Sequence, residues 1–152
     1  MKDLSNKVAI ITGSSSGVGA ATARLFASLG CHVVVNYNAN SAGAEQVAKE
    51  CEELGVETVC FGGSVANDTD CVAMVKAAMD KWGRVDILVN NAGTTKFVDH
   101  NNLDGLDAED FQRIYGVNVI GCYQMTRAAR AAMEANDEGG AVVNIASTAA
   151  VT

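Results

Sequence analysis

The fold is decided by eight residues near the start of the chain, Thr12-Gly13-Ser14-Ser15-Ser16-Gly17-Val18-Gly19. They connect the apolar run Val8–Thr12, which is typical of a buried strand, to a helix expected over Gly17–Leu29. A tight turn from strand to helix directs free backbone N–H groups and the positive end of the helix dipole toward one point, where a diphosphate fits. Glycine lets the chain turn sharply and approach such a ligand closely, and the serines add hydroxyl donors. The stretch therefore predicts a nucleotide-binding loop.

Strand-like apolar runs alternate with segments of helical period along the rest of the chain. The further strands expected are His32–Asn36, Glu57–Gly62, Asp86–Asn90 and Ala141–Ile145, and the further helices are Ala42–Leu54, Thr69–Trp82 and a long one from Asp107 to about Ala135. Such alternation is typical of parallel β-α-β units whose sheet is covered on both faces. The chain is therefore expected to form a Rossmann-type doubly wound parallel sheet in three α/β/α layers, as one domain over residues 1–152.

Each helix should place its apolar residues along one side. The expected sets are Val18, Leu25 and Leu29 in the first helix, Val47, Cys51 and Leu54 in the second, and Val72, Val75, Met79 and Trp82 in the third. These positions recur at intervals of three or four residues, or sums of these, which keeps them near one another on a helix surface.

Composition excludes several classes of function. The 152 residues are 49% hydrophobic and 19% charged, which suits a globular protein, and a net charge of -7 without a Lys/Arg cluster argues against nucleic-acid binding. The five cysteines contain no C-x-x-C pair and the two histidines lie far apart, so neither a disulfide framework nor a metal site is expected. The polar start indicates no signal peptide, and no apolar run reaches membrane-spanning length. We expect a cytoplasmic protein with free thiols and no membrane partner.

Two motifs carry a resemblance to a known family. The spacing T-G-x-x-x-G-x-G over Thr12–Gly19 resembles the cofactor motif of the classical short-chain dehydrogenases/reductases, whereas it lacks the lysine of a P-loop and does not favour a methyltransferase. The second motif, Asn90-Asn91-Ala92-Gly93, follows the fourth expected strand and matches the family's N-N-A-G run. The resemblance covers nearly the whole chain. The sequence is similar in general character to 3-oxoacyl and acetoacetyl thioester reductases and to sugar and polyol dehydrogenases. It implies that Asn90 braces the central sheet.

The resemblance implies that a nicotinamide dinucleotide lies across three strand ends. The cofactor-binding residues carried over are Thr12, Gly13, Ser14, Ser15, Ser16, Gly17, Val18, Gly19, Asn36, Tyr37, Asn38, Ser64, Val65, Asn91, Ala92 and Gly93. The second strand ends without the carboxylate that selects NAD, so NADP(H) is preferred over NAD(H), with Asn36, Asn38 and Ser41 as neutral donors. Asn36→Asp is then expected to shift the preference toward NAD. Ser64 replaces an aspartate usual in the family and offers only a neutral contact.

Two residues match the family's catalytic positions. Asn118 lies within the long expected helix, where the family's asparagine is linked to a local disturbance of the helix and to a water in the proton relay. Ser147 follows the fifth strand and matches the serine that hydrogen-bonds the substrate carbonyl or hydroxyl. Both assignments come from the resemblance, and the alternatives are a surface amide for Asn118 and a capping or loop residue for Ser147.

The family's Y-x-x-x-K acid/base pair has no counterpart among the tyrosines. Tyr37, Tyr115 and Tyr123 have no lysine four residues later, and Tyr123-x-x-x-Arg127 is interpreted as an ordinary helix pair. We expect a piece of a longer enzyme that transfers hydride between NAD(P)(H) and a carbonyl or alcohol substrate, inactive over these residues alone. The last strand, Ala141–Ile145, should then be an exposed sheet edge. The alternative is a non-catalytic dinucleotide-binding module.

A longer enzyme is also expected to form a homo-oligomer. In the family, the outer face of the long helix contributes to a dimer or tetramer interface. Four small residues on this helix, Ala128, Ala129, Ala131 and Ala132, would allow close packing, although their strong helix propensity is the simpler explanation.

Overall fold

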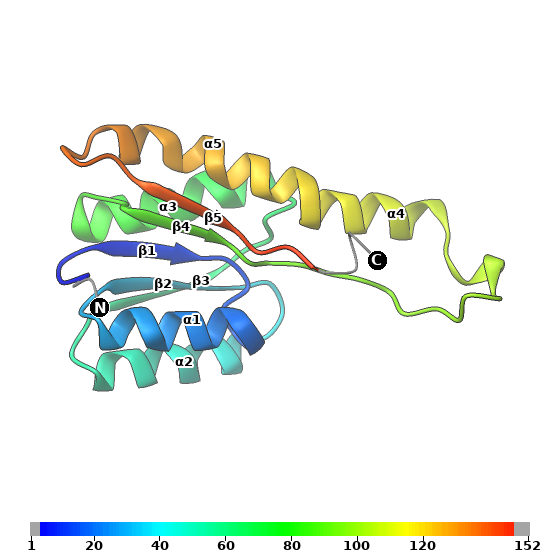
Figure 1. Cartoon of the computed structure of the whole chain (residues 1–152), viewed down its shortest axis with the longest axis horizontal. Coiled ribbons are helices and arrows are strands. Elements are labelled where there is room, and N and C mark those ends of the chain that lie inside the picture. Colours follow the sequence, from blue (N-terminus) through cyan, green and yellow to red (C-terminus); the bar gives the residue numbers. More distant parts are fainter. Residues whose placement is uncertain (1–3, 148–152) are drawn as a thin grey trace.

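The computed structural model describes residues 4–147, which form a parallel sheet with helices on both faces (Figure 1). The strands are β1 (Val8–Ile11), β2 (His32–Tyr37), β3 (Thr58–Gly62), β4 (Ile87–Asn90) and β5 (Ala141–Asn144). Their order is β3-β2-β1-β4-β5 and every neighbouring pair is parallel, with Ile10 of β1 between Val34 and Leu88. The predicted Rossmann-type fold in three layers is confirmed.

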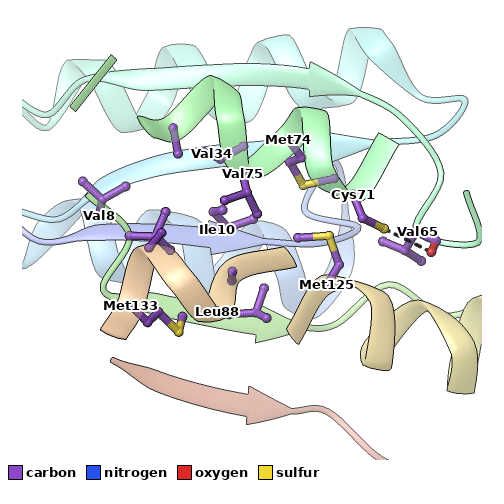
Figure 2. Packing of buried hydrophobic residues seen from close by; sticks show 14 residues of the cluster. Val8, Ile10, Val34, Val65, Cys71, Met74, Val75, Leu88, Met125 and Met133 are labelled. Atoms are coloured by element: carbon purple, nitrogen blue, oxygen red, sulfur yellow. Dashed lines mark hydrogen bonds between the residues drawn. The ribbon is translucent and has the colours of Figure 1, made fainter. Parts of the chain in front are cut away.

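The helices cover the two faces in pairs. In Figure 1, α1 (Gly17–Ser28) and α2 (Ser41–Glu53) lie on one face, and α3 (Asp68–Trp82) and α5 (Gly121–Glu134) lie on the other. Alternation along β1 sends Ile10 into the cluster with α3 and α5 and Ile11 into the cluster with α1 and α2. Figure 2 shows the first cluster, where Met74 and Met125 lie among the side chains over the sheet.

The buried sides of the helices agree with the prediction in part: Val47 and Cys51 of α2 and Val75 of α3 are buried as expected, whereas α1 differs. In α1 the predicted residues Val18 and Leu25 are 60% and 51% exposed, while the fully buried residues are all small, namely Gly19, Ala20, Ala23 and Ala27. Small residues let a helix approach the sheet closely, so in α1 they form the face that packs. The fully buried side of α3 is Cys71, Met74, Val75 and Ala78, with Met79 and Trp82 packed against the core, so the prediction is wrong there only for Val72, which is exposed.

The long predicted helix is interrupted at its middle. Asp107 caps it as expected, in a capping box with Asp110, and α4 then runs over Ala108–Tyr115. A π-helical turn, η2 (Gly116–Ile120), follows and leads directly into α5, with the Gly121 N–H bonded to the Gly116 carbonyl five residues earlier. The local disturbance expected around Asn118 is therefore present. A single 3₁₀ turn, η1 (Leu103–Gly105), precedes α4.

Two surfaces expected from the sequence can be compared with the structure. They are the group of alanines on α5 and the exposed sheet edge at β5. Ala129 and Ala132 are buried within the chain's own core, so of the four alanines considered for close packing with another subunit these two are already packed inside the fold. β5 pairs with β4 on one side only, and its Val142 and Val143 are 42% and 45% exposed. The strand is thus an exposed edge in the described residues, as expected.

One buried carboxylate ties the beginnings of β1 and β4 together. Asp86 accepts a hydrogen bond from the Val8 N–H (2.9 Å) and two from Arg84 (2.6 and 2.8 Å), and its side chain is 7% exposed. Burial alone would raise the pKa of Asp86, but these hydrogen bonds and the charges of Arg84 and Lys7 outweigh it and hold the pKa below its usual value. The ionised form is therefore the one that the fold stabilises.

Asp86→Asn should destabilise the protein in a pH-dependent way. At pH 7 we expect a loss of about 2 kcal/mol in the free energy of unfolding, because the variant loses charged hydrogen bonds at a buried site. A depressed folded pKa contributes stability above the unfolded pKa, about pH 4, and loses it as pH falls further. The difference between the two proteins, measured by urea unfolding, should therefore shrink between pH 5 and about 3.

A matched control is Asp80→Asn, which breaks the exposed pair with Lys76. Its effect should stay below about 0.5 kcal/mol at every pH, because exposed helical pairs contribute little. If the Asp86→Asn difference were the same at pH 7 and pH 3, the ionised carboxylate would not be the stabilising form.

Candidate active site

The predicted glycine loop packs directly against the end of β4. A Cβ atom on Gly13 would lie 2.8 Å from the Cα of Ala92, and one on Gly19 would lie 2.5 Å from the amide nitrogen of Asn91. Neither distance is tolerable for a real side chain. Gly13 also has a φ of +64°, which favours glycine. These two positions therefore require glycine, and the loop and the N-N-A-G run form one surface.

Thr12 fastens this surface. Its hydroxyl donates to the Val89 carbonyl (3.3 Å) and accepts hydrogen bonds from the N–H groups of Asn91 (3.0 Å) and Ala92 (2.9 Å). The Asn91 amide donates in return to the carbonyls of Thr12 (2.9 Å) and Gly13 (3.2 Å). Thr12 is 1% exposed, so its predicted role as a cofactor contact is corrected to that of a brace.

Ser14 and Asn36 form a second brace, between the loop and β2. The Ser14 hydroxyl donates to the Ile11 carbonyl (2.7 Å) and accepts from the Asn36 backbone N–H (2.9 Å), and the side-chain oxygen Oδ1 of Asn36 accepts from the Gly13 N–H (2.9 Å). Both side chains are buried. The prediction that they donate hydrogen bonds to a cofactor is therefore wrong, because the protein's own backbone occupies them.

The remaining hydrogen bonds of Asn36 also change the effect that we expect of the Asn36→Asp substitution. Its amide nitrogen donates to the carbonyls of Tyr37, Phe61 and Gly63, at 3.3, 3.2 and 3.0 Å. A carboxylate at this position would replace that donor and face carbonyl oxygens in a buried place. Asn36→Asp is therefore expected to disturb the fold rather than to select a cofactor. Tyr37 is half-buried, with its ring against Gly62, and does not line the cleft described next.

A cleft of about 620 Å³ crosses the carboxyl ends of the central strands. From the predicted set it is lined by Gly13, Ser15, Ser16, Val18, Asn36, Asn38, Ser64, Val65, Asn91, Ala92 and Gly93. Ligands of open α/β sheets bind at this edge. Most of the predicted cofactor-binding residues therefore meet in one place, whereas Gly17 and the buried residues Thr12, Ser14 and Gly19 are outside the lining.

The two predicted catalytic residues lie in an adjoining hollow. This hollow, about 720 Å³, is lined by both Asn118 and Ser147, together with Cys122 and the end of β5. It shares residues 91–94 with the first cleft, so the two lie next to each other along this segment, and together they are called the groove below. Residues widely separated in the sequence thus converge on one site, as the resemblance implied.

Asn118 holds one wall of the groove. Its side-chain oxygen accepts a hydrogen bond from the Thr94 N–H (2.8 Å), and its nitrogen donates to the Thr94 carbonyl (2.9 Å). This two-point clamp fixes the chain just after the N-N-A-G run. The amide is thus engaged by backbone, which gives Asn118 a positioning role in this structure.

The sequence analysis missed several lining residues. Arg113 and Val117 reach the cleft from α4 and η2, and Asn40 reaches it as the N-cap of α2. Periodicity indicates that a helix exists but not which of its turns borders a cleft. The available signal was the Asp110-x-x-Arg113 spacing, which predicts a pair on one helix side.

Ser64 has a structural role that the sequence did not reveal. Its N–H donates to Asp70 (2.9 Å) and its hydroxyl accepts from the Ala66 N–H (3.3 Å), so the residue shapes the turn between β3 and α3. The Asp70 carboxylate is thereby turned toward backbone at this strand end. Ser64 nevertheless lines the cleft.

The described residues give little support to a metal site, a nucleophilic cysteine or a membrane-spanning helix. Within residues 4–147, no group of three or more His, Cys, Asp or Glu residues is placed to hold a metal ion. Burial raises the pKa of Cys122, the thiol that lines the hollow, and raises that of Cys31 to about 12. Thiols with raised pKa values stay protonated at neutral pH and are poor nucleophiles. In the same described part, no helix has the length and apolarity needed to cross a membrane.

Comparison with known proteins agrees with this geometry. The family model for short chain dehydrogenases matches residues 7–152. A 3-oxoacyl-[acyl-carrier-protein] reductase of Synechocystis is 36% identical over 149 residues, which cover 98% of this chain and 59% of the relative.

Solved structures give the same result. A short-chain dehydrogenase/reductase from Burkholderia xenovorans is 40% identical with a TM-score of 0.90, covering 96% of this chain and 61% of that one. A 7α-hydroxysteroid dehydrogenase, solved with NADH and 7-oxo glycochenodeoxycholic acid, is 33% identical with a TM-score of 0.89, covering 99% and 56%. The chain thus spans somewhat more than half the length of these relatives. It belongs to the classical short-chain dehydrogenase/reductase family.

Proposed function

We propose that the protein is an oxidoreductase that transfers hydride between NAD(P)(H) and a carbonyl or secondary alcohol. The observation that carries this proposal is the pair of adjoining hollows over the strand ends, with the glycine loop in one and Asn118 and Ser147 in the other. The whole protein's reaction is inferred here from a chain that spans only part of its relatives.

The residues of the cleft fit a dinucleotide. Ser16, the N-cap of α1, makes no side-chain hydrogen bond to the helix, and the first turn of α1 holds no acidic residue. The first-turn N–H groups and the helix dipole therefore favour an anion there. The bound cofactor would supply the hydride chemistry, while the protein supplies binding, orientation and electrostatics.

The hollow beside the cleft is proposed to hold the substrate oxygen. Ser147 lies beyond the carboxyl end of β5, and we assign its hydroxyl the role of orienting the carbonyl or hydroxyl group by a hydrogen bond. No tyrosine of the described residues lines this hollow. The proposal therefore assigns proton transfer to the tyrosine and lysine that the resemblance implies in a longer polypeptide.

The cofactor is proposed to be NADP(H) rather than NAD(H). Asn38 and Asn40 line the cleft after β2, and no Asp or Glu lines it among the described residues. A carboxylate at this place would repel a 2′-phosphate, so its absence permits NADP. Asn38 replaces Asn36 as the position that should decide the preference.

The protein is also proposed to form a homo-oligomer. Phe111 and Tyr115 of α4 and Tyr123 of α5 are 64%, 59% and 64% exposed, so the outer side of this helical segment carries large apolar surfaces. Such surfaces commonly lie at interfaces between subunits. Size measurement in solution distinguishes a monomer from a dimer or tetramer.

Ser16→Asp should abolish much of the dinucleotide binding. A carboxylate within about 5 Å of a phosphate repels it by about 1 to 3 kcal/mol at a half-exposed site, so we expect affinity to fall about tenfold or more. Calorimetric titration of NADP(H) into the purified protein measures this. Ser16→Asn is the neutral control and should bind within about threefold of the unmodified protein. Equal affinities for all three proteins would remove the glycine loop from the binding site.

Asn38→Asp should weaken NADP(H) by about tenfold and leave NAD(H) nearly unchanged, because the new carboxylate opposes only the 2′-phosphate. Asn38→Ser removes the amide without adding charge and serves as the control. The measurement is the ratio of the two dissociation constants. A parallel change for both cofactors would show that Asn38 does not face the 2′-position.

Ser147→Ala should lower kcat/KM of the full-length enzyme by about 10²- to 10³-fold, as expected when a hydrogen bond to the reacting oxygen is lost. Cofactor affinity should stay within about twofold. Suitable substrates are 3-oxoacyl thioesters and hydroxysteroids, the compound classes of two relatives. Tight cofactor binding by the unmodified protein without any turnover of carbonyls or alcohols would instead favour a non-catalytic dinucleotide-binding module.

A further inference from the structure

The cleft contains a single charged side chain among the described residues. Arg113 reaches it from α4, and every other lining residue is neutral. The protein as a whole carries a net charge of -7, so a cation facing an acid-free cleft is unusual for this molecule. A dinucleotide placed in the cleft would meet Arg113 as its one ionic partner among residues 4–147.

Arg113 is held in place by its own helix. Asp107 and Asp110 form the capping box that begins α4, and this fixes the Asp110 side chain, which is 12% exposed. One Asp110 oxygen pairs with Lys96 and the other accepts from Arg113 Nη2 at 3.1 Å. The hydrogen bond from Lys96, above all, holds the pKa of Asp110 below its usual value. Asp110 thus remains an ionised anchor even if Arg113 engages another anion.

A second contact fixes the guanidinium at the groove. Arg113 Nη1 donates to the Thr94 hydroxyl at 2.9 Å, and Thr94 is itself clamped by Asn118. These bonds use only part of the guanidinium's donors, and its other N–H groups bond to no residue in the part of the chain that the structure describes. The side chain is 46% exposed. It is therefore preorganised and still able to receive an anion.

We infer that Arg113 binds a phosphate of the dinucleotide. This inference rests on the proposed function, because it takes the cleft as the cofactor site. A planar guanidinium presents N–H donors in a fork that matches phosphate oxygens, and its orientation here is already restricted by Asp110 and Thr94. The phosphate is either the diphosphate, which NAD and NADP share, or the 2′-phosphate, which only NADP carries.

The test is a titration of the purified protein with NAD and with NADP at two salt concentrations. Arg113→Gln should bind one or both cofactors about tenfold more weakly, since a charged hydrogen bond to phosphate is lost, and its affinity should depend less on salt. Arg113→Lys keeps the charge and should retain more affinity than Arg113→Gln. Thermal unfolding of each variant confirms that a weakened variant is still folded.

Two controls separate the phosphate contact from other effects. Arg130→Gln removes an equal charge from an exposed helical pair outside the cleft and should leave both affinities unchanged. Thr94→Val removes the hydroxyl that Arg113 contacts but keeps the guanidinium, so it reports the consequence of losing only that bond.

The outcomes distinguish the diphosphate from the 2′-phosphate. They also distinguish failure of the inference about Arg113 from failure of the proposed function. Equal loss for both cofactors identifies the diphosphate, and loss for NADP alone identifies the 2′-phosphate. Unchanged affinities in folded Arg113→Gln, or a loss no larger than that of Thr94→Val, would overturn the inference while the proposed function stands. An unmodified protein that binds neither cofactor would overturn the proposed function and the inference with it.

Discussion

The contact between the glycine loop and the end of β4 is the constraint on which the site depends. Gly13 and Gly19 bring the loop so close to Asn91 and Ala92 that no Cβ atom fits between them. The Thr12 hydroxyl then bridges the two backbones. Because β1 and β4 are neighbours in the parallel sheet, this contact turns two separate strand ends into one rigid floor. The cleft and the adjoining hollow are both built on that floor.

The sequence predicted the strands, the loop and the start of the long helix because each has a local signature, whereas the disturbance at Asn118 was expected only from the family resemblance. Apolar runs, glycine spacing and the capping residue Asp107 can all be recognised within a few neighbouring positions. The buried roles of Ser14 and Asn36 have no such signature, since their hydrogen bond joins residues 22 positions apart. A hydroxyl or amide in a nucleotide-binding loop has the same appearance in sequence whether it contacts the ligand or the backbone.

The face of α1 that packs on the sheet was the other feature that the sequence did not determine. A hydrophobicity pattern selects large apolar residues, but α1 packs through Ala20, Ala23 and Ala27, which bring its axis close to the sheet. Val18 is consequently free to line the cleft, where an exposed apolar side chain can contact a ligand. The same choice of packing face thus explains both why the predicted core was wrong at Val18 and why this side chain lines the cleft.

Charge is distributed so that, among residues 4–147, an acidic protein has a cleft that no carboxylate lines. Asp70, next to the cleft at the β3 end, accepts from the Ser64 backbone, and Asp110, next to Arg113, is paired with two cations. Thr94 connects Arg113 to the adjoining hollow, because Arg113 and Asn118 both bond to it and it lines both the cleft and the hollow. A shift of Thr94 would therefore change the walls of the cleft and of the hollow together. The π-helical turn at Gly116–Ile120 contains Asn118, whose side-chain nitrogen donates to the Thr94 carbonyl and so holds this shared wall in place.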